Sequence, residues 1–287
     1  MKSMVVFLIA CLTGSSAWAD GPKVVTDIPA IQSLAAMVMG DVRTPAVLVG
    51  GADDPHHFQM RPSQARSLAD ADILIWVGAD LTPWLAASAR SLATDAQSLE
   101  LLGVSGTLQL TDDHGLDPHA WLAPENGFLW LEKIAEVLIA ADPENAATYE
   151  INRTNAQAAL GVTVTALKSQ LAETGPHSII AAHDAYGYFA HSFGIRIAGA
   201  LSDTDNTAAS AARVRSLQQI IANEPITCVV YEDGQDTGAL DALIAGTGIQ
   251  SASLNATGVG MNPGAGLYTE LLGNIANQLA NCSVQPN

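Results

Sequence analysis

Residues 142–176 read DPENAATYEINRTNAQAALGVTVTALKSQLAETGP, and this stretch decides how the chain is organised. It begins with Asp142, Pro143 and Glu144, which serve as a capping residue, a proline in the first turn and an acid in the first turn, and all three favour helix initiation. Gly175-Pro176 ends the stretch. A single helix of roughly 30 residues would run about 45 Å. Such a helix over 142–174 would link two lobes and limit how far they swing. Gly161 leaves a second interpretation open, two helices broken near that residue.

Short apolar runs alternate with helix-like segments on both sides of this stretch. The strands are predicted at 23–26, 46–50, 73–78, 178–182, 195–201, 227–231 and 250–254. The helices are predicted at 29–39, 62–70, 124–140, 186–193, 208–222, 237–245 and 267–280. Alternation of this kind implies parallel sheets covered by helices. The predicted fold class is therefore α/β, with two parallel-sheet lobes, 20–141 and 175–287, joined by one long rigid helix.

The first 19 residues have the pattern of an export signal. Lys2 supplies positive charge, residues 4–12 are apolar, and Ala17-Trp18-Ala19 is a cleavage site before Asp20. The apolar run is shorter than the about 20 residues that span a bilayer. A lipoprotein signal that ends at Cys11 is the alternative. Either interpretation predicts export, and the first predicts a periplasmic protein.

The charge of the chain is strongly acidic. Its formal value of −17 becomes −18 in the mature protein, because Lys2 is the only charged residue lost with the signal. Such a surface repels nucleic acid and anionic lipid, and it mildly concentrates cations. We therefore expect no nucleic-acid partner.

The mature chain keeps two cysteines, Cys228 and Cys282. Thiols tend to be oxidised in an export compartment, so a disulfide is expected rather than two buried thiols. The bridge would close a loop of about 55 residues. Restricting the unfolded chain in this way should stabilise the fold by roughly 4 kcal/mol. The same argument keeps both cysteines away from a metal.

Three histidines each follow a short apolar run or lie in a loop marked by proline. His56 follows the apolar run 46–50, His119 lies in the loop Asp117-Pro118-His119, and His183 follows the strand 178–182. Asp184 is a candidate acceptor that would fix the ring of His183. Neutral imidazole is the commonest protein ligand for zinc. The pattern predicts a transition-metal ion held in the cleft between the lobes, whereas His177 and His191 are expected to be ordinary exposed residues.

Three motifs around these histidines resemble those of a known family, the zinc and manganese solute-binding proteins of ABC importers. They are PHHFQMRPS (55–63), DPHAWLAPEN (117–126) and AHDAYGYF (182–189). The resemblance covers nearly the whole mature chain and includes the long helix and the cysteine pair. It implies that His56, His119 and His183 bind the metal, and that a monomer carries the ion to a membrane permease. Histidine at the third position, where manganese-type members carry glutamate, implies zinc.

Two departures from the family pattern concern the metal. Where the family commonly carries an aspartate as fourth ligand, this chain has Asn255. A neutral amide is a weak zinc donor, so the fourth position is open to Asn255, a water, or a carboxylate such as Glu232 or Asp233. The family's long histidine-rich loop is reduced to residues 111–116, in which His114 is either a weak collecting site or part of an exposed acidic loop.

Three functions are compatible with such a site. The first is zinc capture for an ABC importer, without catalysis. The second is a zinc chaperone or sensor, which needs the same site. The third is a zinc hydrolase, since three protein ligands plus water is also a catalytic arrangement. The chain has no His-Glu-x-x-His motif with a built-in base, which disfavours the hydrolase.

Overall fold

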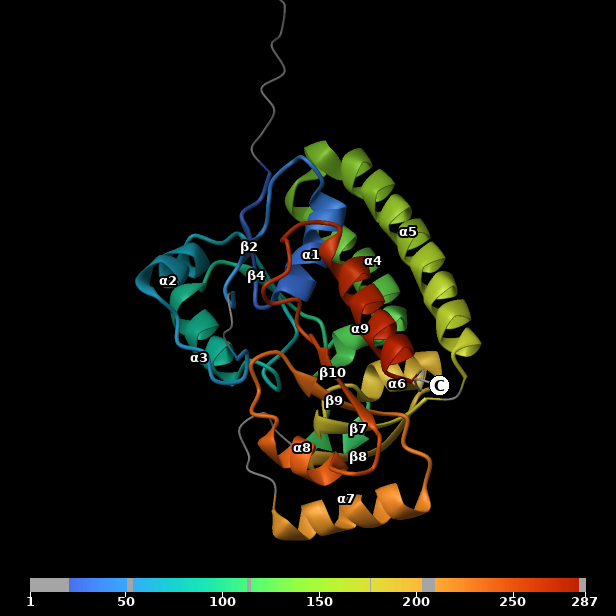
Figure 1. Cartoon of the computed structure of the whole chain (residues 1–287). Helices are drawn as coiled ribbons and strands as arrows, with labels where there is room; N and C mark the ends of the chain where they lie inside the picture. The colour runs from blue at the N-terminus through green and yellow to red at the C-terminus, as the bar shows by residue number, and fades with distance from the viewer. Residues whose placement is uncertain (1–20, 51–53, 113–114, 176, 203–209, 284–287) are drawn as a thin grey trace, which may run out of the picture.

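Two parallel sheets, one in each lobe, organise the residues that the computed structural model describes, namely 21–50, 54–112, 115–175, 177–202 and 210–283 (Figure 1). The order β2-β1-β3-β4 forms the first sheet and β10-β9-β7-β8 the second, with all neighbours parallel. The strands are β1 (Val24–Thr26), β2 (Ala46–Val47), β3 (Ile73–Trp76), β4 (Gln97–Glu100), β7 (Ser178–His183), β8 (Arg196–Ser202), β9 (Cys228–Glu232) and β10 (Gln250–Leu254). The predicted fold class is confirmed.

Helices flank both sheets. The N-terminal lobe has α1 (Pro29–Met39), α2 (Pro62–Ala69), α3 (Pro83–Leu92), the 3-10 turn η1 (Ala120–Leu122) and α4 (Pro124–Ala141). Each of the four α-helices carries proline in its first turn, where the missing N–H has no helical partner to lose. The C-terminal lobe has α6 (Gly187–Phe193), α7 (Ala211–Asn223), α8 (Gly238–Ile244) and α9 (Leu267–Ser283).

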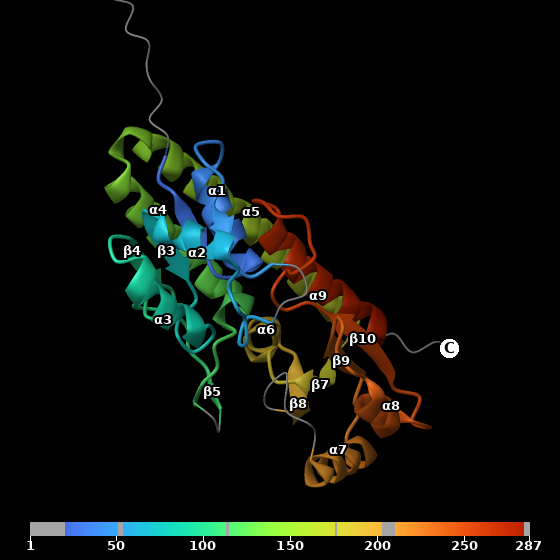
Figure 2. The same cartoon turned by 90° about the vertical axis from the view of Figure 1, so that its left-hand side faces the viewer.

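The long helix between the lobes is α5 (Ala146–Glu173), which follows a 3-10 turn, η2 (Pro143–Asn145). It is continuous through Gly161, so the two-helix interpretation is wrong. Its buried side chains form one stripe, Tyr149, Ala156, Leu160, Leu167 and Leu171. The stripe packs on α1 and α4 of the first lobe and on α9 of the second (Figures 1 and 2). The helix is therefore fixed along its length to both lobes.

One apolar core passes through both lobes. The same cluster of buried side chains includes Ile31 of α1, Trp130 of α4, Leu160 of α5, Phe189 of α6 and Leu272 of α9. Two smaller clusters lie on the outer faces of the sheets. The lobes are therefore joined by buried apolar contacts as well as by α5.

The remaining strands form an antiparallel hairpin, β5 (Thr111–Asp112) and β6 (Gly115–Leu116). His114 lies between them, outside the described residues. The export signal expected at 1–19, with Cys11, also lies outside them. Within the described ranges, none of the helices combines the length and the apolar character that crossing a bilayer requires.

His177 corrects one expectation, because it is buried rather than exposed. Its Nδ1 lies 2.7 Å from Ser283 Oγ at the end of α9, and its Nε2 lies 3.1 Å from the carbonyl oxygen of Leu171 in α5. Because a carbonyl oxygen only accepts, Nε2 carries a proton. Through these two contacts His177 joins the end of the linking helix to α9.

Asp27 is a buried carboxyl group at the end of β1. Its Oδ1 accepts from the backbone N–H of Ile28 and its Oδ2 from that of Val77, both at 2.8 Å. Burial raises the pKa of Asp27 from 3.8 to about 7, against the opposing effect of these two donors. The side chain ties β1 to the residue that follows β3.

This raised pKa predicts a pH-dependent stability. The folded protein retains a proton that the unfolded chain releases at a lower pH, so the free energy of unfolding should fall as pH rises from about 4 to about 7. Relative to Asp27→Asn, the wild type should lose a few kcal/mol over this range in denaturant titrations of the metal-free protein. Asp95→Asn, on the exposed surface, is the control. A difference between wild type and Asp27→Asn that stays constant with pH would contradict the prediction.

Candidate metal centre

His56 lies in the loop between β2 and α2, and Asp54 shapes this loop. Asp54 Oδ1 accepts from the backbone N–H of His56 at 2.8 Å, while Oδ2 lies 2.9 Å from Nδ1 of His57. The side chain of His57 is 68% exposed, whereas His56 is half-buried. The two adjacent rings therefore lie in different environments, and His56 is the one directed toward the other histidines.

His119 precedes η1 and is buried. Asp117 Oδ1 lies 2.9 Å from its backbone nitrogen and 2.8 Å from its Nδ1. A carboxylate accepts but does not donate, so Nδ1 carries the proton and Nε2 keeps the lone pair that a metal requires. The sequence analysis did not single out Asp117 as a partner of His119, although its place two residues before the histidine was a usable signal.

The loop that carries Asp117 is held by the second lobe. Tyr188 of α6 donates to the carbonyl oxygen of Asp117 at 2.8 Å. A side chain at Gly187 would place its Cβ 3.1 Å from Asp117 Oδ2, so the glycine permits this close approach. The first turn of α6 therefore packs directly on the carboxylate that orients His119.

His183 is the last residue of β7, a central strand of the second sheet, and it is 3% exposed. Its Nδ1 lies 3.8 Å from Oε1 of Glu232, at the end of the neighbouring strand β9. The hydroxyl of Tyr186 lies 3.5 Å from the same oxygen. Parallel pairing of β7 with β9 brings these two strand ends, and hence the histidine and the carboxylate, together.

The three rings lie close together. Ring centres lie 5.2 Å apart for His119 and His183, 5.6 Å for His56 and His119, and 6.3 Å for His56 and His183. The planes cross at 64–81° rather than stacking. With zinc–nitrogen bonds of about 2.0–2.1 Å and tetrahedral angles, rings on one ion would have centres about 5 Å apart. His119 and His183 already have this spacing, and His56 lies slightly outside it.

The spacing of the three rings is therefore wider than that of a zinc site. In the part of the chain that the structure describes, no group of three or more His, Cys, Asp or Glu side chains is positioned to hold a metal ion as it stands. The two wide distances both involve His56. A displacement of the His56 ring by roughly an ångström would give the spacing of a zinc site.

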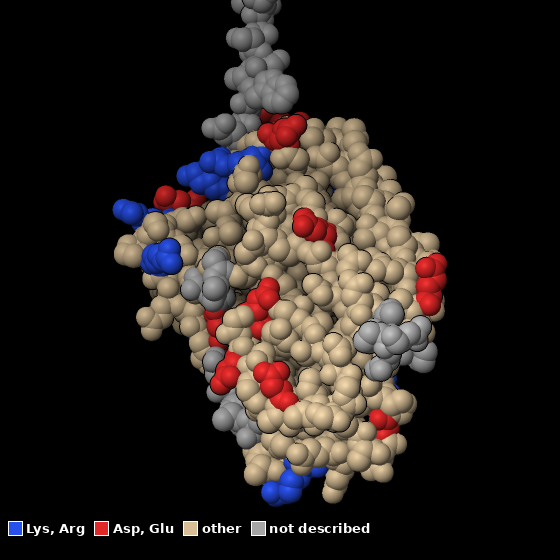
Figure 3. Space-filling view, in the orientation of Figure 1, with Lys and Arg blue, Asp and Glu red and all other residues tan. Residues whose placement is uncertain are grey.

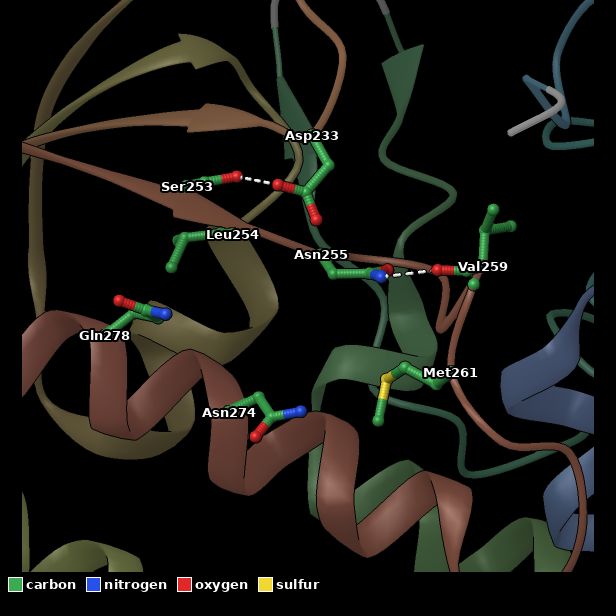
Figure 4. Close-up of a pocket in the computed structure, with 9 residues that line it drawn as sticks. Asp233, Ser253, Leu254, Asn255, Val259, Met261, Asn274 and Gln278 are labelled. Carbon is green, nitrogen blue, oxygen red and sulfur yellow. Dashed lines mark hydrogen bonds between the residues drawn. The ribbon is translucent and has the colours of Figure 1, made fainter. Parts of the chain in front are cut away.

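Asn255 follows β10 and lies in a loop that its own side chain stabilises. Nδ2 donates to the carbonyl oxygen of Val259 at 2.7 Å, and Oδ1 accepts from the backbone N–H of Gly258 at 2.8 Å. The side chain lines a separate cavity of about 410 Å³, together with Asp233, Ser253, Leu254, Val259, Gly260, Met261, Asn274 and Gln278 (Figure 4). None of the three histidines lines this cavity. Both polar atoms of the amide are thus engaged within the loop.

The same loop connects the lobes beside the histidines. Trp121 of η1 donates from Nε1 to the carbonyl oxygen of Ala256 at 2.6 Å, and Tyr268 of α9 donates to the carbonyl oxygen of Trp121 at 2.7 Å. All three residues are buried. The Trp121 ring lies 5.4 Å from the ring of His119. The hydrogen bonds between the lobes therefore involve Trp121, whose ring lies beside His119, a candidate ligand.

The predicted disulfide is present between Cys228 of β9 and Cys282 of α9, with Cα atoms 5.7 Å apart. It closes the second lobe at the sheet end opposite His183 and Glu232, since Cys228 begins the strand that Glu232 ends.

The visible surface carries the acidic excess on both lobes, whereas Lys and Arg side chains gather mainly toward the upper left (Figure 3). With a formal charge of −17, the surroundings attract cations in general. Such a charge does not by itself distinguish one cation from another.

Comparisons with known proteins agree on one family. A family model described as the periplasmic component A of a zinc-uptake complex matches residues 24–282. The chain is 40% identical to the high-affinity zinc uptake system protein ZnuA of Paracoccus denitrificans, over 92% of each chain. It is 26% identical to the protein of the same name from Brucella abortus, over 96% of this chain and 95% of the other.

Solved structures share the fold. A crystal structure of ZnuA superposes with a TM-score of 0.80 at 24% identity, covering 92% of this chain and 100% of the other. The Zn(II)-bound ZnuA-like domain of Streptococcus pneumoniae AdcA gives 0.73 at 20% identity, covering 91% and 99%.

Proposed function

The chain belongs to the family of periplasmic zinc-uptake complex components, and we propose that it captures one zinc ion with His56, His119 and His183 and delivers it to the permease of an ABC transporter. The observation that carries this assignment of ligands is the convergence of three imidazole rings, two from the first lobe and one from the second. A nitrogen-rich donor set suits zinc better than manganese or magnesium.

The immediate surroundings of the rings support zinc binding rather than structural packing. Asp117 fixes the tautomer of His119, and Glu232 lies beside Nδ1 of His183. Carboxylates in this position orient histidines toward zinc and raise their basicity. We propose that both rings bind the ion through Nε2, and that Glu232 orients His183 in the way that Asp117 orients His119.

The fourth position is proposed to be a water molecule. Asn255 uses both atoms of its amide within its own loop, and Asp233 accepts a hydrogen bond from Ser253. Asn255 would have to give up one of its hydrogen bonds to reach the ion. A water in the fourth position needs no such rearrangement.

Two substitutions test this assignment. Glu232→Gln is expected to weaken zinc binding about tenfold, because an orienting carboxylate is lost.

Asn255→Asp is expected to leave zinc affinity nearly unchanged and to lower the free energy of unfolding by about 1–3 kcal/mol, since a carboxylate oxygen would face the carbonyl of Val259. Competition with a chromophoric chelator and denaturant titration measure the two effects. Tighter zinc binding by Asn255→Asp would instead identify residue 255 as the fourth ligand.

Export and assembly complete the proposal. We propose that residues 1–19 are removed on export, so that the mature chain begins at Asp20 and acts as a monomer. Residues 20–141 form the first lobe, 142–174 the link and 175–287 the second lobe. The family's periplasmic location supports this assignment. Mass spectrometry of the protein recovered from the periplasm would give the mature N-terminus directly.

The decisive experiment is zinc uptake by a reconstituted transporter. Proteoliposomes that contain the partner permease and its ATPase should import zinc only when this protein is added outside. A protein with His183→Ala should not support uptake. Tight zinc binding without any effect on uptake would favour the chaperone or sensor over the importer component.

A further inference from the structure

We propose that Trp84 is a positioning residue for His56, an inference that rests on the proposed zinc site. The indole Nε1 of Trp84 donates to the carbonyl oxygen of Pro55 at 2.8 Å. Its ring packs against Phe58, with ring centres 5.2 Å apart. One side chain therefore holds the backbone immediately before His56 and the side chain two residues after it.

Trp84 is itself well placed to act as an anchor. It lies in the first turn of α3, between buried Thr82 and Leu85. Thr82 donates from its backbone N–H to the carbonyl oxygen of Gly78 at 3.0 Å, in the turn that leaves β3. The contact with Pro55 therefore connects the His56 loop to the central strands of the first sheet.

His56 is the ligand whose position is most open to such control. It is half-buried, whereas His119 and His183 are 5% and 3% exposed. The two longest distances between ring centres, 5.6 and 6.3 Å, both involve it. Because the other two rings are already at ligand spacing, the loop that carries His56 sets how closely the third donor approaches the ion.

Trp84→Phe removes the N–H donor and keeps an aromatic ring against Phe58. We expect it to weaken zinc binding by about five- to tenfold, which corresponds to one net hydrogen bond. Trp84→Leu also removes the ring, and the loss should reach about 10–100-fold. The matched control is Trp76→Phe, which deletes an indole hydrogen bond to Ser98 in the same lobe and should change affinity by less than about twofold.

Cobalt(II) in place of zinc gives a second readout. The visible d–d bands of cobalt depend on ligand geometry, so they should shift in Trp84→Phe and stay unchanged in Trp76→Phe. A merely destabilising substitution would lower the melting temperature without shifting the bands. Circular dichroism on each variant verifies the fold.

A double-mutant cycle decides whether Trp84 acts through His56. In the His56→Ala background, Trp84→Phe should cause no further loss of affinity. An equal loss in both backgrounds, or unchanged affinity and cobalt bands in the single variant, would overturn the inference. A wild-type protein that binds no zinc would instead overturn the proposed function, so the two failures are distinguishable.

Discussion

Replacing His183 by alanine is expected to weaken zinc binding by more than about 100-fold, because loss of a ligand should exceed the about 10–100-fold that loss of an orienting partner costs. His183 is buried at the end of a central strand, so the variant loses a donor that the sheet holds in place. The fold should survive, because the substitution removes a single ring and leaves only a small cavity at the edge of the core. Competition with a chromophoric chelator measures the affinity.

The matched control for this substitution is His191→Ala. His191 is an exposed histidine of α6, eight residues further along the chain. Its removal should leave zinc affinity unchanged, and both variants should keep the circular dichroism of the wild type. Equal affinity of His183→Ala and wild type would remove His183 from the site and leave two ligands, too few for tight zinc binding.

Removing the disulfide is expected to have the largest effect on stability. The bridge joins residues 54 positions apart, and the double variant Cys228→Ala, Cys282→Ala should lose about 2–4 kcal/mol of unfolding free energy. Cys228 is fully buried in β9, so each alanine also leaves a small cavity. Denaturant titration of the metal-free protein measures the loss.

Chemical reduction provides the control for these two alanines. Wild-type protein in strong reductant should approach the stability of the double variant, with a small excess because its thiols still fill the core. Zinc affinity should change little, since the bridge lies at the opposite end of β9 from Glu232. If reduced and oxidised proteins unfold at the same denaturant concentration, the bridge does not stabilise the fold.

The sequence predicted most elements closely where the local signals were strong. The helix expected at 29–39 and the strand at 250–254 match α1 and β10. Strand β4 and helix α3 were missed. In β4, Gln97, Ser98 and Glu100 are exposed on an edge strand, so the apolar pattern that marks the buried strands is absent.

The surroundings of the site depend more on distant residues. Asp117 could have been identified from its place beside His119, but Glu232 reaches His183 only because β9 pairs with β7. His177 was wrongly expected at the surface because the partner that helps to bury it, Ser283, is 106 residues away. Such contacts follow from the order of strands and helices, which spacing along the chain does not give.

The apolar core that passes through α1, α4, α5, α6 and α9 has a consequence for how metal enters and leaves. A wide hinge motion would expose this shared interior to water at each transport cycle, and burial of apolar surface makes that costly. Exchange should therefore depend on small movements of the His56 loop, with the two halves melting together as a single cooperative unit. Calorimetry of the ion-loaded and ion-depleted states should show one heat-absorption peak in each, and a chain severed within α5 should yield halves that precipitate rather than refold.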